Sequence, residues 1–140
     1  MISNQNYRNE ILPFSIEGTR IRGRIVRLSN VYHDLLETKQ YPEIVANFIG
    51  ELATLTILLA DTIKYDGIFI LQTQSDGPIN ISVADITHTG LIRGYALYDK
   101  VKLDKISAHP SVPELLGSGR LAFTIDQGGS KERYQGIVAL

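Results

Sequence analysis

The chain has no cysteine and no tryptophan, and methionine occurs once among its 140 residues. Without cysteine, these residues cannot form a disulfide, a thiolate metal site or a thiol-based redox switch. The absence fits a reducing compartment, and the polar first residues lack the apolar core of a secretory signal peptide. We therefore expect a cytoplasmic protein.

An excess of charge of one sign is also missing, because 14 basic residues stand against 15 acidic ones and the net charge is −1. Such a balance provides no broad positive field for nucleic acid or an anionic membrane. The most apolar stretch, residues 44–63, is interrupted by Asn47, Glu51 and Asp61, whereas a membrane helix needs about 20 predominantly apolar residues. We expect neither nucleic acid nor a membrane as a partner.

The residues that are present suit a folded domain, with 44% hydrophobic and 21% charged side chains. Residues 1–10 are expected to form a loose lead-in. Apolar residues then alternate over 12–16 and again over 19–28. In the second run, Ile21 and Ile25 are expected to lie on the buried face of a half-buried strand. The chain therefore opens with two predicted strands.

Two helices are predicted next. Ser29 is a suitable N-cap for a first, short helix that should end near Thr38. Pro42 suits the first turn of a second helix over residues 42–63, whose apolar positions cover most of its circumference. A helix that is apolar nearly all round is buried in a core or an interface, so we expect this one to be central.

The second half of the chain predicts strands. Runs of alternating or β-branched residues occupy residues 68–74, 79–86, 91–98, 121–125 and 134–140. The sequence Ser75-Asp76-Gly77-Pro78 between the first two runs is typical of a tight hairpin turn. Polar loops are expected between the third and fourth runs, and over residues 126–133.

A short helical turn is predicted inside the first of these loops. Ser111 and Glu114 have the spacing of a capping box, and Gly117 can end the turn. Consecutive hairpins predict a largely antiparallel sheet packed against one short helix and one long apolar helix. The fold class is therefore α+β, within a single domain spanning residues 1–140.

Few residues suggest catalysis or metal binding. His33, His88 and His109 are scattered without the spacing of a metal site, so surface or structural roles are the simpler interpretation. Ser118 lies in a Gly-Ser-Gly connector that matches neither a phosphate loop nor a nucleophile elbow. We expect no metal ligand and no catalytic residue in this chain.

Two groups of charged residues leave alternatives open. Four aspartates lie near strand ends or turns, where Asp bonds its own backbone, although a catalytic carboxylate pair across the sheet ends is conceivable. They are Asp66, Asp76, Asp85 and Asp126. The arginines at 20, 22 and 24 form a stripe that either grips an anion or is the solvent face of a strand. The neutral net charge favours the second interpretation.

Several strings of residues are more specific, and six of them occur in the order found in one family. They are Arg22-Gly23, Tyr41-Pro42, Lys64-Tyr65-Asp66-Gly67 with Leu71-Gln72 and Ser75-Asp76-Gly77-Pro78-Ile79-Asn80, Arg93-Gly94, Gly119-Arg120-Leu121-Ala122-Phe123-Thr124-Ile125-Asp126, and Arg133-Tyr134-Gln135-Gly136-Ile137-Val138. From about Arg20 to Leu140, the chain resembles the N-terminal domain of the thirty-three-kilodalton heat-shock protein family, the bacterial redox-regulated holdase chaperones.

The resemblance implies a stress-responsive chaperone that needs no ATP, binds unfolding client proteins and is active as a dimer. In that family, a C-terminal domain holds zinc through four cysteines, and oxidation ejects the zinc and unfolds a linker. This sequence stops at Leu140, inside what resembles a strand, and has none of those cysteines. We therefore expect an incomplete chaperone core that has no cofactor of its own and forms a homodimer or a domain-swapped oligomer.

The residues shared with the family are expected to serve turns, bulges, strand ends or close sheet packing rather than catalysis. They are Gly67, Asp76, Gly77, Pro78, Arg93, Gly94, Gly119, Asp126, Tyr134, Gln135 and Gly136. The alternative is a small-ligand-binding or enzymatic α+β domain that shares only these local strings. Such a domain would need a convergent polar pocket with a carboxylate or histidine of perturbed pKa.

Overall fold

A computed structural model describes residues 9–37, 39–129 and 131–140 of the chain. Residues 1–8 of the predicted lead-in and the expected helix end at Thr38 lie outside them. The elements in chain order are β1 (Glu10–Ser15), β2 (Arg22–Arg27), α1 (Asn30–Glu37), α2 (Glu43–Ala60), β3 (Ile68–Ser75), β4 (Ile79–Thr87), β5 (Ile92–Tyr98), α3 (Lys100–Leu103), α4 (Val112–Leu116), β6 (Gly119–Asp126) and β7 (Tyr134–Ala139).

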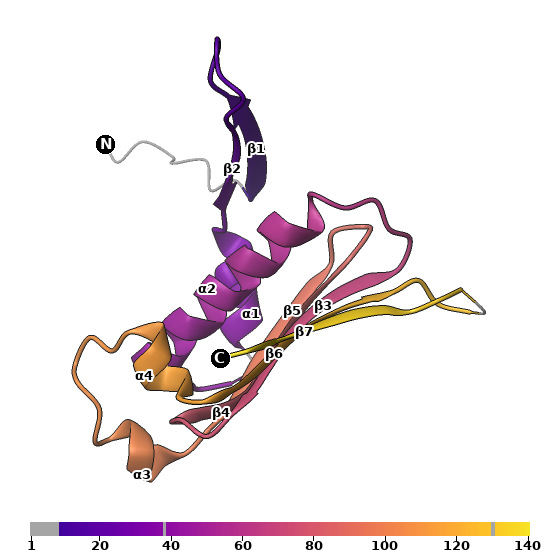
Figure 1. Cartoon of the computed structure of the whole chain (residues 1–140). Helices are drawn as coiled ribbons and strands as arrows, with labels where there is room; N and C mark the ends of the chain where they lie inside the picture. The colour runs from indigo at the N-terminus through magenta and orange to yellow at the C-terminus, as the bar shows by residue number, and fades with distance from the viewer. Residues whose placement is uncertain (1–8, 38, 130) are drawn as a thin grey trace.

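The strands form two separate antiparallel sheets. Five of them make one sheet in the order β5-β4-β3-β6-β7, while β1 and β2 pair only with each other. Figure 1 shows α2 lying along one face of the larger sheet and the β1–β2 hairpin projecting away from it. The α+β prediction is confirmed, but the sheet is not a simple series of consecutive hairpins, because β6 pairs with β3 on the side opposite β4.

The long helix forms the core with the sheet, as predicted. Val45 and Ile49 of α2 are fully buried, and they belong to one cluster with Phe69 and Leu71 of β3. The helix begins one residue later than expected, with Pro42 as its N-cap, and it ends at Ala60. Its length and composition would also suit a membrane span, but half of it is buried within the domain, as in the core helix of a soluble protein.

The expected short helical turn is α4, and its capping box is confirmed. The Ser111 side chain accepts a hydrogen bond from the Glu114 amide, and a Glu114 carboxylate oxygen accepts one from the Ser111 amide at 2.7 Å. Gly117 ends the turn with a φ of 65°, a value that favours glycine.

The polar loop before α4 contains a helix that we did not predict, α3. Asp99 caps it, because its Oδ1 atom accepts a hydrogen bond from the Lys102 amide at 3.0 Å. An i,i+4 ion pair between Lys100 and Asp104 supports the same turn. Asp99 as an N-cap was the available sequence signal. A helix of four residues is too short to show helical periodicity in the sequence.

The predicted burial of the second strand is wrong. Ile21 is 56% exposed and Ile25 is 54% exposed. The strand itself, β2, is present within the expected range and pairs with β1, but its contacts with α2 leave Ile21 and Ile25 exposed. The alternation of apolar and polar residues predicted the strand, but it does not show whether another element packs over that strand.

Candidate functional site

The β1–β2 hairpin, residues 10–27, carries six exposed large apolar side chains, and we call it the arm. Its large apolar side chains are between 37% and 56% exposed. They are Ile11, Leu12, Phe14, Ile16, Ile21 and Ile25. Exposed apolar side chains gathered on one element typically mark a surface that binds other molecules.

Two polar contacts hold the base of the arm to the helices. Arg24 of β2 forms an ion pair with Asp61 at the end of α2, with 2.5 Å between Nε and Oδ2. Asn9 accepts a hydrogen bond from the Ser29 amide at 2.8 Å, so Asn9 caps the entry to α1 where we expected the Ser29 side chain. Of the predicted arginine stripe, Arg24 therefore has a structural partner, while Arg20 and Arg22 lie on the solvent side.

An apolar cleft of about 290 Å³ lies where the arm meets the body. Ile11 and Val26 of the arm line one side, and Ile57 and Ile86 of the body line the other. A second hollow of about 330 Å³ shares Ile11, Ile57 and Ile86 with it and extends towards Tyr65. The apolar surface of the arm thus continues into the body.

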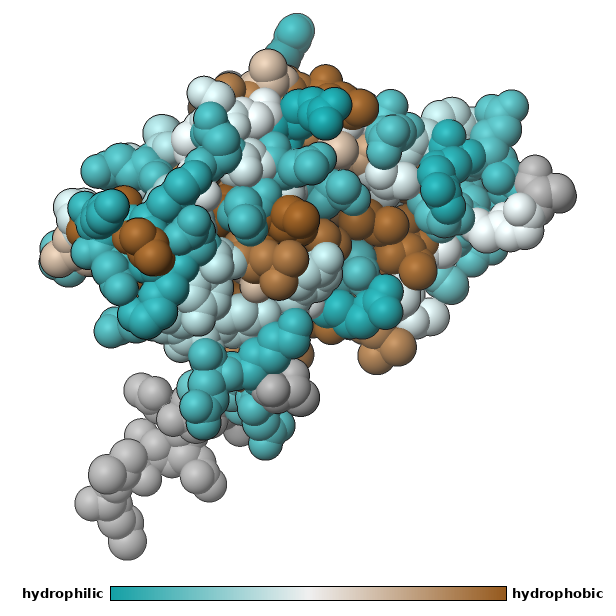
Figure 2. All heavy atoms as spheres, turned by 90° about the horizontal axis from the view of Figure 1, so that it is seen from below, coloured by the Kyte–Doolittle hydropathy of each residue, from teal (hydrophilic) through white to brown (hydrophobic). Residues whose placement is uncertain are grey.

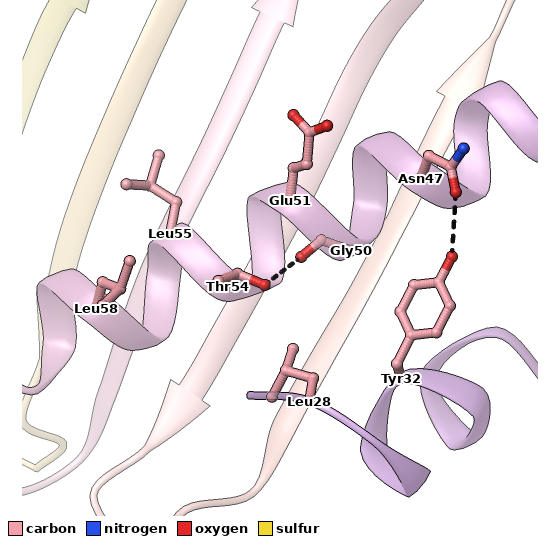
Figure 3. A pocket seen from close by; sticks show the side chains of 8 residues that line it. All are labelled: Leu28, Tyr32, Asn47, Gly50, Glu51, Thr54, Leu55 and Leu58. Carbon is pink, nitrogen blue, oxygen red and sulfur yellow. Dashed lines mark hydrogen bonds between the residues drawn. The ribbon is translucent and has the colours of Figure 1, made fainter. Parts of the chain in front are cut away.

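A broader groove of about 650 Å³ runs along the outer face of α2. In Figure 3, Leu55 and Leu58 lie towards one end of the helix, and Leu28 and Tyr32 lie beside it, with the Tyr32 hydroxyl facing Asn47. The Tyr32 ring lies against Gly50, where any larger side chain would collide with it. The only charged residue that lines the groove within the described part of the chain is Glu51. The outer face of α2 is therefore a partly apolar surface.

The β6–β7 end of the sheet is a third apolar region. Its exposed side chains are Phe123, Tyr134, Ile137, Val138 and Leu140. Figure 2 shows apolar side chains in patches in the middle of the face seen from below, with hydrophilic side chains around them. Apolar surface is thus available on more than one side of the molecule.

The predicted candidate aspartates are each held by a different partner. Asp76 accepts a hydrogen bond from the Ser118 amide at 2.7 Å, which ties the β3–β4 turn to the start of β6. Asp85 is almost buried and receives two hydrogen bonds from Arg93, at 3.1 and 3.2 Å. These contacts give three of the shared residues, Asp76, Arg93 and the neighbouring Gly77, structural positions.

The other two aspartates lie at the end of the sheet opposite the Asp76 turn, the same end as Asp85. Asp66 is 3.4 Å from both His88 and Lys131. Asp126 accepts hydrogen bonds from the Gly128 amide and from Arg133 at 2.6 Å. No hydrogen bond within the described ranges joins two of the four carboxylates.

A hydrogen bond to Asp104 raises the pKa of Lys100, and three further ionisable groups have shifted pKa values with simple causes. Hydrogen bonds from Ser111 lower the pKa of Glu114. The Gly128 amide, followed by Arg133, lowers the pKa of Asp126. Burial raises the pKa of Tyr65, whose hydroxyl donates to the Ile86 carbonyl. All three shifts follow from contacts that hold turns and loops together.

The histidines occupy three unrelated places. The ring of His33 packs edge-on against Tyr32, with 5.9 Å between centroids. His88 accepts a hydrogen bond from the Gly67 amide at 3.1 Å, and His109 lines a hollow beside α4. Across the residues that the structure describes, no three potential ligands come close enough to hold a metal. These residues do not match a four-cysteine zinc site, so zinc has no part in the function proposed below.

The shared glycines lie at close backbone approaches. A Cβ on Gly67, which has a φ of 143°, would collide with the Asp126 carbonyl. A Cβ on Gly119 would collide with the Gln74 carbonyl, and one on Gly136 would collide with the Phe123 ring. Pro78 accepts a hydrogen bond through its carbonyl from the Asp99 amide, at 2.8 Å, beside the predicted turn.

The remaining shared residues hold the last strand. Gln135 donates a hydrogen bond to Thr124 at 3.1 Å, and Tyr134 begins β7 opposite Ile125. Gly94 lies under Leu35 and Ile49, where a Cβ would make contacts at 3.4 Å. These contacts join neighbouring elements of the fold.

The described fold spans the region that a family model recognises. The model for the Hsp33 protein family matches residues 9–140. The chain belongs to the Hsp33 family. The match begins earlier than the resemblance that we identified from Arg20 onwards, and it includes all of the arm.

Individual Hsp33 proteins agree with this assignment. The chain is 42% identical over 135 residues to the 33 kDa chaperonin of Nitrosococcus oceani, covering 96% of this chain and 45% of that protein. It is 38% identical over 133 residues to the 33 kDa chaperonin of Caulobacter vibrioides, covering 93% and 44%. The chain therefore spans less than half the length of the curated Hsp33 relatives that it matches.

A solved structure confirms the fold. The crystal structure of the 33 kDa chaperonin, a heat shock protein 33 homologue, from Thermotoga maritima superposes with a TM-score of 0.76 at 21% identity. The match covers 93% of this chain and 45% of the Thermotoga chain. At this level of identity the likeness concerns the fold alone.

The exposed residues of the arm were the part of the site that sequence reasoning missed. Ile11 and Leu12 point to opposite sides of β1, so no single face of this strand carries the apolar side chains. Pro13 lies inside the same strand, and proline in a strand is typical of sheet edges. Together these two features signalled an isolated hairpin.

Proposed function

We propose that this Hsp33 chain is the core of an ATP-independent holdase, which binds unfolding proteins and prevents their aggregation. The observation that carries the proposal is the arm, whose six large apolar side chains are 37% to 56% exposed. The chaperonin names of the relatives support the same class of function. No catalytic step is part of the proposal.

The physical basis is burial of apolar surface. Each Å² of apolar surface removed from water contributes about 25 cal/mol to binding before the entropic costs of association. An unfolding protein exposes such surface throughout its sequence, so contacts with it need no specific complementary shape. The arm and the groove along α2 offer apolar area at separate places, which suits diffuse contacts with an extended chain.

The test is suppression of aggregation of a heat-unfolded client protein, followed by light scattering without ATP. The double variant Leu12→Ser and Phe14→Ser should lose most of the suppression, because it removes apolar side chains that are 47% and 46% exposed. Val101→Ser is the matched control, since Val101 is 64% exposed but lies on α3. Equal suppression by the arm variant and the control would contradict the proposal.

The proposal includes two further properties and a cytoplasmic location. The chain should self-associate at micromolar concentration through its apolar surface, which light scattering coupled to chromatography can measure. Its chaperone activity should not respond to peroxide or reductant, because these 140 residues contain no cysteine. A clean monomer would contradict the first property, and a strong response to oxidant would contradict the second.

A further inference from the structure

Within the described residues, the outer edge of β7 presents backbone groups that pair with no other strand. The Leu140 amide donates to the Gly119 carbonyl at 2.9 Å, which marks this residue pair as hydrogen-bonded. In an antiparallel pair, hydrogen-bonded and non-hydrogen-bonded positions alternate. In the observed register, the residues of β7 that bond to β6 are therefore Tyr134, Gly136 and Val138, and those that face outwards are Gln135, Ile137 and Ala139.

The bonding of β6 to its other neighbour supports this alternation. The Asp76 amide donates to the Ser118 carbonyl at 3.0 Å, so on that side of β6 the bonded positions begin with Ser118 and continue with Arg120 and Ala122. Gly119, Leu121 and Phe123 are left to bond β7. The hydrogen bonds on both sides of β6 therefore agree that Gln135, Ile137 and Ala139 direct their backbone groups away from β6.

The opposite edge of the sheet is covered. The Ala96 amide of β5 donates to the Tyr41 hydroxyl at 3.3 Å, and α1 packs against the same strand. The Lys39 ammonium lies 5.0 Å from the centre of the Tyr95 ring. A lysine and covering side chains are the usual protection of a sheet edge.

The β7 edge has none of this protection within its own strand. Residues 134–139 read YQGIVA and contain neither charge nor proline. Ile137 and Val138 are 59% and 54% exposed. No other strand in the described ranges pairs with the outer side of β7. An uncharged, exposed edge of this kind is a template for another strand.

We propose that β7 binds an extended segment of an unfolding protein by strand addition. The proposal rests on the proposed holdase function and names the binding mode. A folded protein has already paired most of its backbone N–H and C=O groups, whereas an unfolding one has not. The edge therefore distinguishes unfolding chains from folded ones by their free backbone groups, in addition to their apolar side chains.

The surroundings of the edge suggest the side chains of the bound segment. Gln135 and Ile137 line a hollow of about 160 Å³ on the exposed sheet face, together with Gln72, Gln74 and Arg120. Within the described ranges Arg120 has no ion pair. A segment with apolar side chains and one acidic residue near Arg120 complements this face.

The test uses short fluorescent peptides rich in Val and Ile with one Glu, and fluorescence anisotropy as the readout. Methylation of the backbone nitrogens on one edge of the peptide should weaken binding about ten-fold or more, because each lost hydrogen bond is worth about 1 kcal/mol and the methyl groups block close approach. As the control, a peptide methylated at one backbone nitrogen on its other edge, which points away from β7, should bind as the parent peptide does. Equal binding of all peptides would overturn the proposal.

A protein variant tests the same edge from the other side. Ile137→Pro removes an outward amide and leaves the hydrogen bonds to β6 intact, while Ile137→Ala shortens the side chain and keeps the backbone donor. We expect Ile137→Pro to bind the parent peptide about ten-fold more weakly, and Ile137→Ala to bind it within about three-fold. Circular dichroism checks folding, and the methylated peptides keep the test valid if the proline variant unfolds.

The outcomes separate this proposal from the holdase function. Suppression of client aggregation without any effect of peptide methylation would overturn strand addition and leave the holdase proposal standing. Loss of suppression by the arm variant together with a methylation effect would support both. If Ile137→Pro instead converts a dimer into monomers and the peptide does not compete with dimer formation, β7 pairs with a second copy of this chain and the proposal is wrong.

Discussion

The arm and the central strand β3 carry the same sequence pattern with opposite results. Leu12 and Phe14 alternate in β1, as Phe69 and Leu71 alternate in β3. The first two side chains are 47% and 46% exposed, while the second two are 1% and 0% exposed. The difference lies in what each strand packs against, because Phe69 and Leu71 belong to the core cluster with α2, whereas Leu12 and Phe14 do not belong to it. A period of two thus specifies a strand, and its surroundings decide whether the strand builds a core or a binding surface.

The largest expected contrast comes from shortening one leucine in each region. Leu71→Ala should lower the free energy of unfolding by about 2–5 kcal/mol, because it leaves a cavity in the core. Leu12→Ala should change it by less than about 0.5 kcal/mol, because little packs against this side chain. Urea unfolding followed by circular dichroism measures both values. A large cost for Leu12→Ala would mean that the arm is itself part of a packed core.

Hydroxyl groups give a second contrast. Thr73 and Ser82 are buried, and their hydroxyl oxygens are 2.5 Å apart. Ser82→Ala leaves the Thr73 hydroxyl without its partner and should cost about 1–3 kcal/mol. Thr19→Ala is the control in the arm, where the exposed Thr19 hydroxyl bonds the Ile16 carbonyl at 2.8 Å and water can replace it.

A double variant sharpens the interpretation of that result. Thr73→Val combined with Ser82→Ala removes both hydroxyl groups, so no unsatisfied group stays buried. Its free energy of unfolding should exceed that of Ser82→Ala alone. If the double variant is less stable than the unmodified chain by the sum of the two single-variant costs, the two hydroxyl groups act independently.

A smaller effect is expected at the contact that joins the two regions. Asp61→Asn removes the ion pair with Arg24, which is partly exposed, so the cost should be about 0–1 kcal/mol and should shrink at high salt. Asp104→Asn is the control, because it breaks an exposed pair with Lys100 within the body. Hydrogen exchange of the β1–β2 amides should rise only in Asp61→Asn. Equal exchange in both variants would show that the contact does not hold the arm.

The smallest effect is a loss of stability in acid that originates in the body. The pKa values of Glu114 and Asp126 are lower in the folded state than their ordinary values of 4.5 and 3.8. Each carboxylate therefore stabilises the fold fully above its ordinary pKa, and this contribution is lost as the pH falls through the folded-state pKa. Urea unfolding at a series of pH values should show a decline below about pH 4.5 that is shallower in Glu114→Gln.

Local features of the fold were predictable from the sequence, and remote ones were not. The capping box of Ser111 and Glu114 and the turn at Asp76-Gly77 depend on neighbouring residues, and both were predicted correctly. The position of β6 beside β3 depends on a contact across about fifty residues, which no local pattern encodes. The shared strings and their order indicated the family, because they carry that information without any geometry.

The candidate site was predicted only in part. Apolar residues cover most of the circumference of α2, and one face of a sheet covers only one side of a helix. The apolar surface that the sheet leaves uncovered includes the groove beside Leu55. The prediction that Ile21 and Ile25 of the arm are buried is wrong, because alternation does not reveal whether a covering layer exists. The outward backbone groups of β7 follow from the register with β6, and register cannot be read from the sequence of one strand.

The central place of β3 has a consequence for synthesis on the ribosome. Its first partner, β4, follows after a tight turn, and β5 and α2 are also close in the chain, so residues 43–98 can pair and collapse as they emerge. Its second partner, β6, is made later, after α3 and α4. Until then the other side of β3 stays open to solvent, and a nascent chain of this protein exposes for a time the kind of strand edge that chaperones protect.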